Sequence, residues 1–286
     1  MSTAFVRVAE PRVVYADGEL VAILKPERMH TAPLAAGESP TLCGWAFARF
    51  PELARAAGPG ARLKEEGGLL QRLDFETSGL VLFARSPEAY VELAAAQAAG
   101  NLRKEYLLRV APTSAEAPRG SRPARTCPRG LDPGEWEEAF RSCLESGPDA
   151  AEPLEGLAAL LRASASRGAP ASVRSRFRPY GPRSAQVACL EEAPPQARGE
   201  QRRRREGTRE AYSTEFLDAR RVGAQLELRV GLVRGFRHQL RAHLAWVGLP
   251  IAGDPLYGGE DWPRLCLHAF RLVLRRPGGL ETSIEC

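Results

Sequence analysis

The sequence has few of the features that mark disulfide-bonded, secreted or membrane proteins. Its 286 residues include only six cysteines, widely spaced and without a Cys-x-x-Cys pair. Such a set is a weak basis for a disulfide framework or a zinc site. No apolar run approaches the ~20 residues that a transmembrane helix needs, and acidic residues precede the first long apolar stretch. These absences predict a protein of the reducing cytoplasm, with neither a membrane segment nor a bound metal.

Lysine is also scarce, since only three of the 40 basic residues are lysines. The other basic residues are arginines, whose planar guanidinium binds phosphate through two points and stacks on bases. The net charge of +5 and the isoelectric point of about 9 are compatible with a nucleic-acid partner. An arginine- and alanine-rich composition also follows from a GC-rich genome, so charge alone does not identify the partner.

The most informative stretch covers residues 67–85 and reads GGLLQRLDFETSGLVLFAR. Its apolar run at 80–84 has the length and composition of a buried strand. The polar residues 76–79 precede this run, and their Thr, Ser and Gly favour a local bend. Asp74 is therefore expected on a loop that enters a core strand, with Arg72 two residues away. Taken alone, an Asp at such a position is most simply a capping residue.

Local patterns elsewhere predict the order of the elements. Asp17-Gly18 between two apolar stretches is a strong hairpin signal, and Lys25-Pro26 ends the second strand because proline cannot donate to a ladder. Ser86 before Pro87 indicates a helix start. The expected strands are 13–15, 20–24, 80–84, 103–110, 211–216, 226–230 and 265–272, and the expected helices are 41–49, 86–100, 135–144, 152–165 and 236–248.

Several of these stretches together resemble the RluA-type RNA pseudouridine synthases. Arg-Leu-Asp-x-x-Thr-Ser-Gly-Leu at 72–80 is similar to the catalytic motif of the family, although Gln71 stands where a His is usual. The resemblance covers most of 12–110 and 211–277. It implies an α+β pseudouridine synthase fold, a mixed and largely antiparallel sheet flanked by helices and loops, in a single catalytic domain over 1–286.

The resemblance also implies the roles of individual residues. Asp74 corresponds to the catalytic carboxylate, and Arg241 to the arginine that pairs with it and stabilises its charged form. Tyr106 corresponds to the tyrosine that packs on the target base and handles a proton at carbon 5, although on its own it reads as a half-buried strand residue. Arg72 corresponds to the side chain that fills the gap of the extruded base. For Lys25 we expect a phosphate contact or a place in the site wall, rather than a merely solvated strand end.

One departure from the family lies at residues 236 and 237. The family has Gly-Arg-x-His-Gln, whereas Phe236 stands here in place of the first Arg and Arg237 follows it. The contact that the missing Arg makes is therefore in doubt. We expect Arg237, His238 and Gln239 to contact RNA. His238 and His243 are five residues apart and lie on different helix faces, so a structural or RNA-facing role is favoured over a metal pair.

Residues 111–205 are the least regular part of the sequence. Pro, Gly, Ser, Ala and Arg dominate 111–172, which is too long for a simple connection in a compact domain. We interpret 111–205 as a variable insertion or surface subdomain. Because only about a dozen residues precede the first strand, we expect no separate N-terminal RNA-binding domain and assign the grip on the substrate to this region. Its segment 173–189 interleaves arginines and aromatics, as RNA-binding surfaces do, whereas Arg202–Arg205 fits a solvated linker or an RNA-contacting loop equally well.

The implied reaction detaches uracil from ribose, rotates it and rejoins it through carbon 5, and it needs no cofactor. The expected partner is ribosomal or transfer RNA, and we expect a monomer. Of two alternative functions, the first stays open and the second is weaker. An RNA-binding module or RNA chaperone on the same fold would have lost the chemistry, and the altered residues 236–237 keep this reading open. A nucleoside or glycoside hydrolase that uses Asp74 needs a second carboxylate at a suitable distance, and Glu76 is too close to Asp74 in the sequence.

Overall fold

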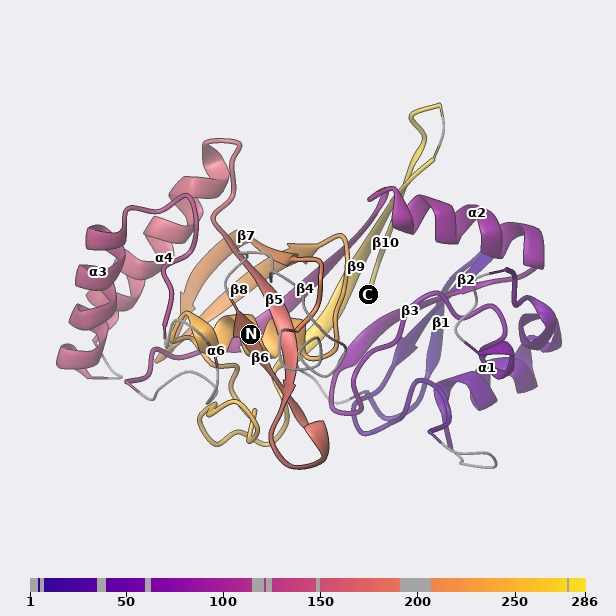
Figure 1. Cartoon of the computed structure of the whole chain (residues 1–286), viewed down its shortest axis with the longest axis horizontal. Helices are drawn as coiled ribbons and strands as arrows, with labels where there is room; N and C mark the ends of the chain where they lie inside the picture. Colours follow the sequence, from indigo (N-terminus) through magenta and orange to yellow (C-terminus); the bar gives the residue numbers. More distant parts are fainter. Residues whose placement is uncertain are drawn as a thin grey trace, which may run out of the picture. The chain divides into compact units, whose positions relative to one another are not determined.

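The computed structural model in Figure 1 describes residues 5, 8–34, 40–59, 63–114, 121, 125–147, 150–190, 207–276 and 278–286. The chain forms two compact units, Met1–Tyr106 with Leu267–Cys286, and Leu107–Cys266. The second unit therefore takes in 111–205 together with the strands and the helix that follow it. Both units combine helices with a largely antiparallel sheet, as the resemblance predicted. Among the described residues, no helix combines the length and the apolar character needed to cross a membrane.

The first unit is built on strands in the order β1-β2-β3-β9-β4, with β10 paired to β9. They are β1 (Arg12–Ala16), β2 (Leu20–Lys25), β3 (Ser78–Ala84), β9 (Leu267–Arg275), β10 (Glu281–Glu285) and β4 (Leu102–Val110), which continues into the second unit. The pairs β1–β2, β2–β3 and β9–β10 are antiparallel, whereas β3 and β9 are parallel. Strand β10 was not among the strands expected from the sequence.

The core of the first unit lies around β2 and β3, in which every residue is buried. Helix α2 (Pro87–Ala98) contributes Tyr90 and Leu93 to the same apolar cluster. As predicted, Ser86 caps this helix by accepting a hydrogen bond from the backbone N–H of Ala89 at 3.1 Å. The unit also contains α1 (Leu42–Arg49) and the short 3₁₀ helices η2 (Pro51–Arg55) and η3 (Lys64–Glu66).

Gly79 in the central motif is required by the way β3 meets β9. Its φ is +127°, and a Cβ at this position would lie 2.3 Å from the carbonyl oxygen of Ala269. Gly79 and Ala269 are direct partners in the parallel pair. A larger residue would therefore separate the two strands immediately after the Asp74 turn.

The second unit has strands in the order β4-β8-β7-β5-β6. They are β5 (Ser172–Tyr180), β6 (Gln186–Leu190), β7 (Tyr212–Val222) and β8 (Gln225–Leu232). The first half of β5 pairs with β7 and the second half with β6, all antiparallel. Within 111–205, which we interpret as a variable insertion or surface subdomain, β5 and β6 are strands of this sheet.

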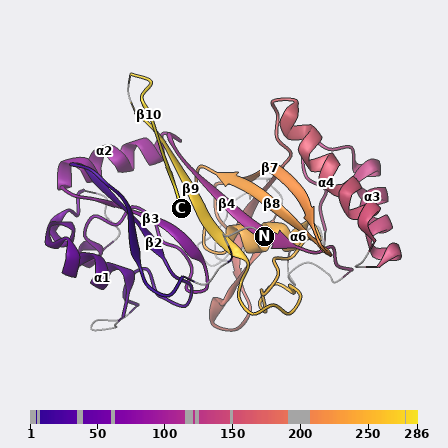
Figure 2. The same ribbon diagram turned by 180° about the vertical axis from the view of Figure 1, so that it is seen from behind.

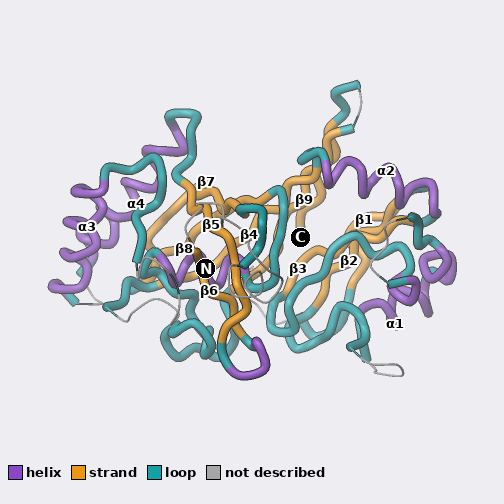
Figure 3. The backbone as a smooth tube through the Cα atoms, in the orientation of Figure 1, coloured by secondary structure: helices purple, strands orange, loops and turns teal. Residues whose placement is uncertain are grey.

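Three α-helices accompany this sheet in the described part of the second unit. They are α3 (Pro133–Ser146), α4 (Ala151–Ser166) and α6 (Gln239–Trp246), with a short 3₁₀ helix η4 (Pro182–Ser184) between β5 and β6. Figure 2 shows α4 against β7 and β8, and Figure 3 shows α3 beside α4 as a helical pair. The pair buries Trp136 and Phe140 of α3 and Leu157 and Leu161 of α4.

Candidate active site

Asp74 lies in a turn whose backbone is fixed by hydrogen bonds to Thr77 and, through the neighbouring Leu73, to Thr31. Its carbonyl oxygen accepts a hydrogen bond from the N–H of Thr77 at 3.1 Å, which closes the turn. The hydroxyl of Thr31 donates to the carbonyl of Leu73 at 2.8 Å and accepts from the N–H of Leu73 at 3.1 Å. Thr31 and Leu73 are buried, whereas Asp74 is partly exposed. The carboxylate therefore stands on a backbone that the core fixes.

Lys25 holds the other side of this turn. Its side chain is 0% exposed, and Nζ donates to the carbonyl oxygens of Pro26 (2.8 Å), Met29 (2.8 Å) and Phe75 (3.3 Å). These bonds offset the cost of burying an ammonium group and tie the loop after β2 to the residue that follows Asp74. Of the two roles that we expected for Lys25, the structure favours the site wall, because a buried ammonium does not reach a phosphate in solvent.

Arg72 forms an ion pair with Glu66, which the sequence analysis did not predict. The Nη2 atom of Arg72 contacts Oε1 of Glu66, and Nε lies 3.4 Å from Oε2. The side chain of Glu66 is 8% exposed and that of Arg72 is 25% exposed. A two-point, partly desolvated pair of this kind is stronger than a surface ion pair. We expected the Arg72 side chain to fill the gap that an extruded base leaves in the RNA, but here it is bound to Glu66 of the same unit. To fill that gap, Arg72 must leave Glu66.

Tyr106 lies on β4 and is 8% exposed. Burial raises the pKa of its phenol, and the negative charge of Asp74 raises it further. Tyr106 is therefore a neutral phenol at neutral pH. Asp74 and Tyr106 both belong to the first unit, and the carboxylate lies near enough for its charge to act on the phenol.

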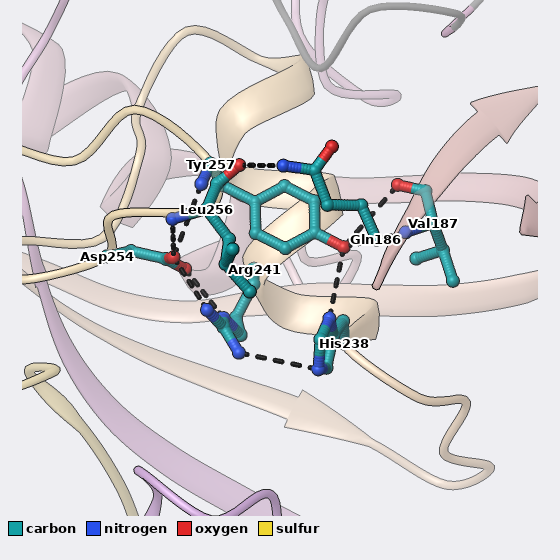
Figure 4. Close-up of polar contacts among 7 residues, drawn as sticks. All are labelled: Gln186, Val187, His238, Arg241, Asp254, Leu256 and Tyr257. Carbon is teal, nitrogen blue, oxygen red and sulfur yellow. Dashed lines mark hydrogen bonds and ion pairs between the residues drawn. The ribbon is translucent and has the colours of Figure 1, made fainter. Parts of the chain in front are cut away.

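In the second unit, Arg241 is held by a buried carboxylate (Figure 4). Its Nε and Nη2 atoms each lie 2.7 Å from an oxygen of Asp254. Asp254 is 0% exposed, and its Oδ1 also accepts from the backbone N–H groups of Leu256 (3.0 Å) and Tyr257 (3.3 Å). The turn at 254–257 thus fixes the carboxylate, and the carboxylate fixes the plane of the guanidinium.

His238 and Tyr257 complete this cluster. The Nη1 atom of Arg241 lies 3.4 Å from Nε2 of His238, and Nδ1 of His238 lies 3.2 Å from the hydroxyl of Tyr257. The guanidinium carbon of Arg241 is 5.3 Å from the centre of the Tyr257 ring, a cation–π distance. His238 has a φ of +56°, a left-handed conformation that is uncommon outside glycine and often marks functional sites.

Asp254 and Tyr257 are the residues that the sequence analysis missed at this site. The stretch Gly-Asp-x-x-Tyr-Gly at 253–258 resembles a family loop, but no role followed from the resemblance. The signal that was available is an Asp directly after a glycine in a loop, where its carboxylate accepts hydrogen bonds from the next turn.

Gln239 supports the sheet rather than facing solvent. It is 2% exposed, and its Nε2 atom donates to the carbonyl of Ser213 (2.9 Å) and to the hydroxyl of Thr214 (3.2 Å). The expected RNA contact of Gln239 is therefore not supported, since both partners lie within its own unit. Arg237 is exposed and donates to the carbonyls of Ser184 and Gln186, so its position suits the contact that we expected.

Phe236 explains the departure from the family pattern. Its ring stacks parallel to that of Phe177, with 5.1 Å between ring centres, and lies 5.1 Å from the ring of Tyr212. The Phe therefore contributes packing where the family usually has a guanidinium.

His243 is a core residue, which fits the structural one of the two roles that were left open for it. It is 0% exposed, and its two ring nitrogens each lie 2.9 Å from a hydroxyl, that of Ser175 for Nε2 and that of Thr214 for Nδ1. Burial lowers the pKa of His243 to about 3, so the ring is neutral at neutral pH. Across the described ranges, no group of three His, Cys, Asp or Glu side chains is placed to hold a metal.

Within 111–205, helices α3 and α4 are acidic, whereas β5 carries arginines. Helices α3 and α4 expose six glutamates, and they carry only two arginines. These residues are Glu135, Glu137, Glu138, Glu145, Glu152 and Glu155, with Arg141 and Arg162. An acidic surface repels phosphate, so the helical pair does not suit the substrate grip that we expected. On β5, Arg174 is exposed but Arg176 is buried. The run Arg202–Arg205 lies outside the described residues.

A sequence model of the family described as RNA pseudouridylate synthase matches residues 19–246. The chain belongs to this family. It is 22% identical over 284 residues to ribosomal large subunit pseudouridine synthase D of Pseudomonas aeruginosa, with 94% of this chain and 65% of that protein covered. It is also 45% identical over 49 residues to the dual-specificity RNA pseudouridine synthase RluA of Pasteurella multocida, with 16% and 22% covered.

These relatives confirm the resemblance to RluA-type proteins. Among solved structures, human RNA pseudouridylate synthase domain containing 1 aligns with a TM-score of 0.52 at 16% identity, with 96% of this chain and 82% of that chain covered. This likeness shows the shared fold. The chain spans less than two thirds of the length of the Pseudomonas relative, of which 65% is covered.

Proposed function

We propose that the protein converts specific uridines in ribosomal or transfer RNA to pseudouridine, with Asp74 as the catalytic carboxylate. The observation that carries this proposal is a partly exposed Asp74 on a turn fixed by the buried side chains of Thr31 and Lys25. A group that acts on one particular atom of its substrate needs such support behind it. Membership of the pseudouridylate synthase family supports the same conclusion.

The reaction conserves atoms and electrons. The bond between C1′ of the ribose and N1 of the uracil breaks, the base turns, and a bond forms between C1′ and C5. C5 loses a proton and N1 gains one, so no cofactor is required. An ionised Asp74 would add to the sugar or the ring, or would stabilise the positive charge that develops on the sugar.

Tyr106 would pack on the target base and take part in the proton transfer at C5. Because burial and the charge of Asp74 raise the pKa of Tyr106, its phenol is a weak base at neutral pH. We propose that it relays the proton and does not retain it. The carboxylate of Asp74, whose charge acts on this phenol, is the acceptor that we favour.

We propose that Arg241 pairs with Asp74 and keeps it ionised. The two-point contact with Asp254 supports this role, because it sets the orientation of the guanidinium before any substrate arrives. Arg72, Arg237 and His238 would contact the RNA. Extrusion of a base from its stack costs a few kcal/mol, and Arg72 would offset part of this cost by leaving Glu66 and filling the gap.

The test is the conversion of uridine in RNA incubated with the purified protein, detected by carbodiimide labelling of a product of unchanged mass. Asp74→Asn is expected to abolish conversion while RNA affinity stays within a few-fold. Glu76→Gln, which neutralises a carboxylate two residues away, is the matched control and is expected to remain active. Turnover by Asp74→Asn would contradict the catalytic role, and an inactive native protein that still binds RNA would favour the RNA chaperone.

A further inference from the structure

Next to Asp74 lies a pair of aromatic rings that the proposed reaction does not use. Phe75 follows Asp74 directly and is 39% exposed. Its ring centre lies 4.6 Å from that of His30, and the two planes are tilted by 40°. Both residues belong to the first unit. We call this pair the His30–Phe75 platform.

The backbone under both rings is anchored. The carbonyl of His30 accepts a hydrogen bond from the N–H of Leu42 at 2.9 Å, at the start of α1. The buried Nζ of Lys25 binds the carbonyl of Met29, which precedes His30, and also the carbonyl of Phe75. One buried ammonium therefore links the two segments that carry the rings and fixes their backbones relative to each other.

Packing within the protein does not explain this arrangement. In the second unit, Phe236 is surrounded by Phe177 and Tyr212 and is only partly exposed. Phe75 instead presents more than a third of its surface to solvent, although burial of a Phe side chain is worth roughly 1.5–3 kcal/mol. A single exposed apolar residue is ordinary. An exposed ring that already contacts a second ring, on an anchored backbone and adjacent to the proposed catalytic carboxylate, indicates a binding surface.

The chemistry of the platform suits a nucleobase. Aromatic side chains recognise the splayed bases of single-stranded RNA by stacking, with little dependence on base identity. Arg28 lies two residues before His30 with a side chain that is 66% exposed, and its Nε is only loosely paired with Glu76 at 3.7 Å. A cation beside a stacking surface is the combination that binds a phosphate and its base together.

We propose that the His30–Phe75 platform stacks an unpaired base next to the uridine on which Asp74 acts. This proposal rests on the proposed function, because it places the RNA strand across the Asp74 turn. It also gives Lys25 a second purpose: the ammonium that supports the Asp74 turn also aligns the platform.

The test is the affinity for a fluorescein-labelled single-stranded oligouridylate, measured by fluorescence anisotropy over a range of salt concentrations. Phe75→Ala is expected to weaken binding roughly 5- to 150-fold, the effect of losing one stacked base, and Phe75→Trp is expected to restore it. Val91→Ala removes side-chain atoms from another exposed apolar residue of the same unit and is expected to change nothing. Circular dichroism of each variant checks that it is folded.

The salt dependence separates stacking from charge. Phe75→Ala is expected to leave the slope of log affinity against log salt unchanged, whereas Arg28→Ala is expected to reduce it by about 0.7. Native affinity in a folded Phe75→Ala protein would overturn the platform, and so would a Trp variant that binds as weakly as the Ala variant. If the native protein binds the oligouridylate through Phe75 but forms no pseudouridine in any RNA, the platform stands and the proposed function fails. If it forms pseudouridine with an unaltered KM in Phe75→Ala, only the platform fails.

Discussion

The Asp74 turn of the first unit and the Arg241 cluster of the second are held rigid in different ways. At Asp74 the core holds the backbone, through Thr31 and Lys25, and leaves the carboxylate partly exposed. At Arg241 the side chain itself is buried and is held by Asp254. The difference fits the proposed tasks, since a carboxylate that reacts must reach its substrate, whereas a guanidinium that stabilises charge acts best in one fixed orientation.

The largest effect is expected when the support of Arg241 is removed. Asp254→Asn removes the buried carboxylate that holds the Arg241 guanidinium at two points, which costs about 3–5 kcal/mol in the free energy of unfolding. Activity is expected to fall with it, because the orientation of Arg241 is lost. Chemical denaturation and the conversion assay measure the two effects. The exposed Asp261→Asn is the control, and an Asp254→Asn protein as stable and active as the native one would show that Arg241 needs no fixed partner.

A smaller effect is expected when the support of the Asp74 turn is removed. Lys25→Met keeps the buried chain but deletes the ammonium, so the carbonyl of Phe75 loses a charged donor. We expect a loss of about 1–3 kcal/mol in stability and a reduced kcat. Because the ammonium also aligns the His30–Phe75 platform, the KM for RNA is expected to rise while kcat falls. A reduced salt slope of binding, with kcat unchanged, would instead restore the phosphate contact that we first expected.

Local sequence signals predicted several elements of the first unit. Asp17-Gly18 gave the β1–β2 hairpin, and Ser86 gave the start of α2, because turns and caps depend on neighbouring residues. The partners across the fold were not predictable in this way. Asp254 is thirteen positions from Arg241 in the sequence, and nothing local reveals that its carboxylate faces the guanidinium.

The sequence also did not reveal which polar side chains are buried. Lys25 and Gln239 are polar residues in motifs of an RNA-modifying family, so an RNA contact was a reasonable expectation, yet both face backbone carbonyls of their own unit. The arginines of β5 likewise suggested a basic surface, although Arg176 is buried. A polar residue type indicates hydrogen bonding, but only the packing of the fold decides whether the partner is RNA or protein.

At neutral pH the smallest effect is that of His243 in the second unit, because its contribution to stability changes only below the pKa of the unfolded chain. Burial lowers the pKa of His243 from 6.5 to about 3, so between these values the unfolded chain binds a proton that the folded chain does not. His243 therefore adds up to about 1.4 kcal/mol per pH unit to the loss of stability as the pH falls through this window, and nothing above it. Denaturation at several pH values should show a shallower dependence in His243→Gln. Equal slopes in the two proteins would contradict a neutral buried ring.

The central claim is that Asp74 forms pseudouridine in a cellular RNA. The most direct measurement maps pseudouridines by carbodiimide labelling in cells that lack the gene, and in the same cells complemented with the native protein or with Asp74→Asn. We predict that specific sites disappear in the deletion, return with the native protein and stay absent with Asp74→Asn. An unchanged map in the deletion, or full restoration by Asp74→Asn, would contradict the account.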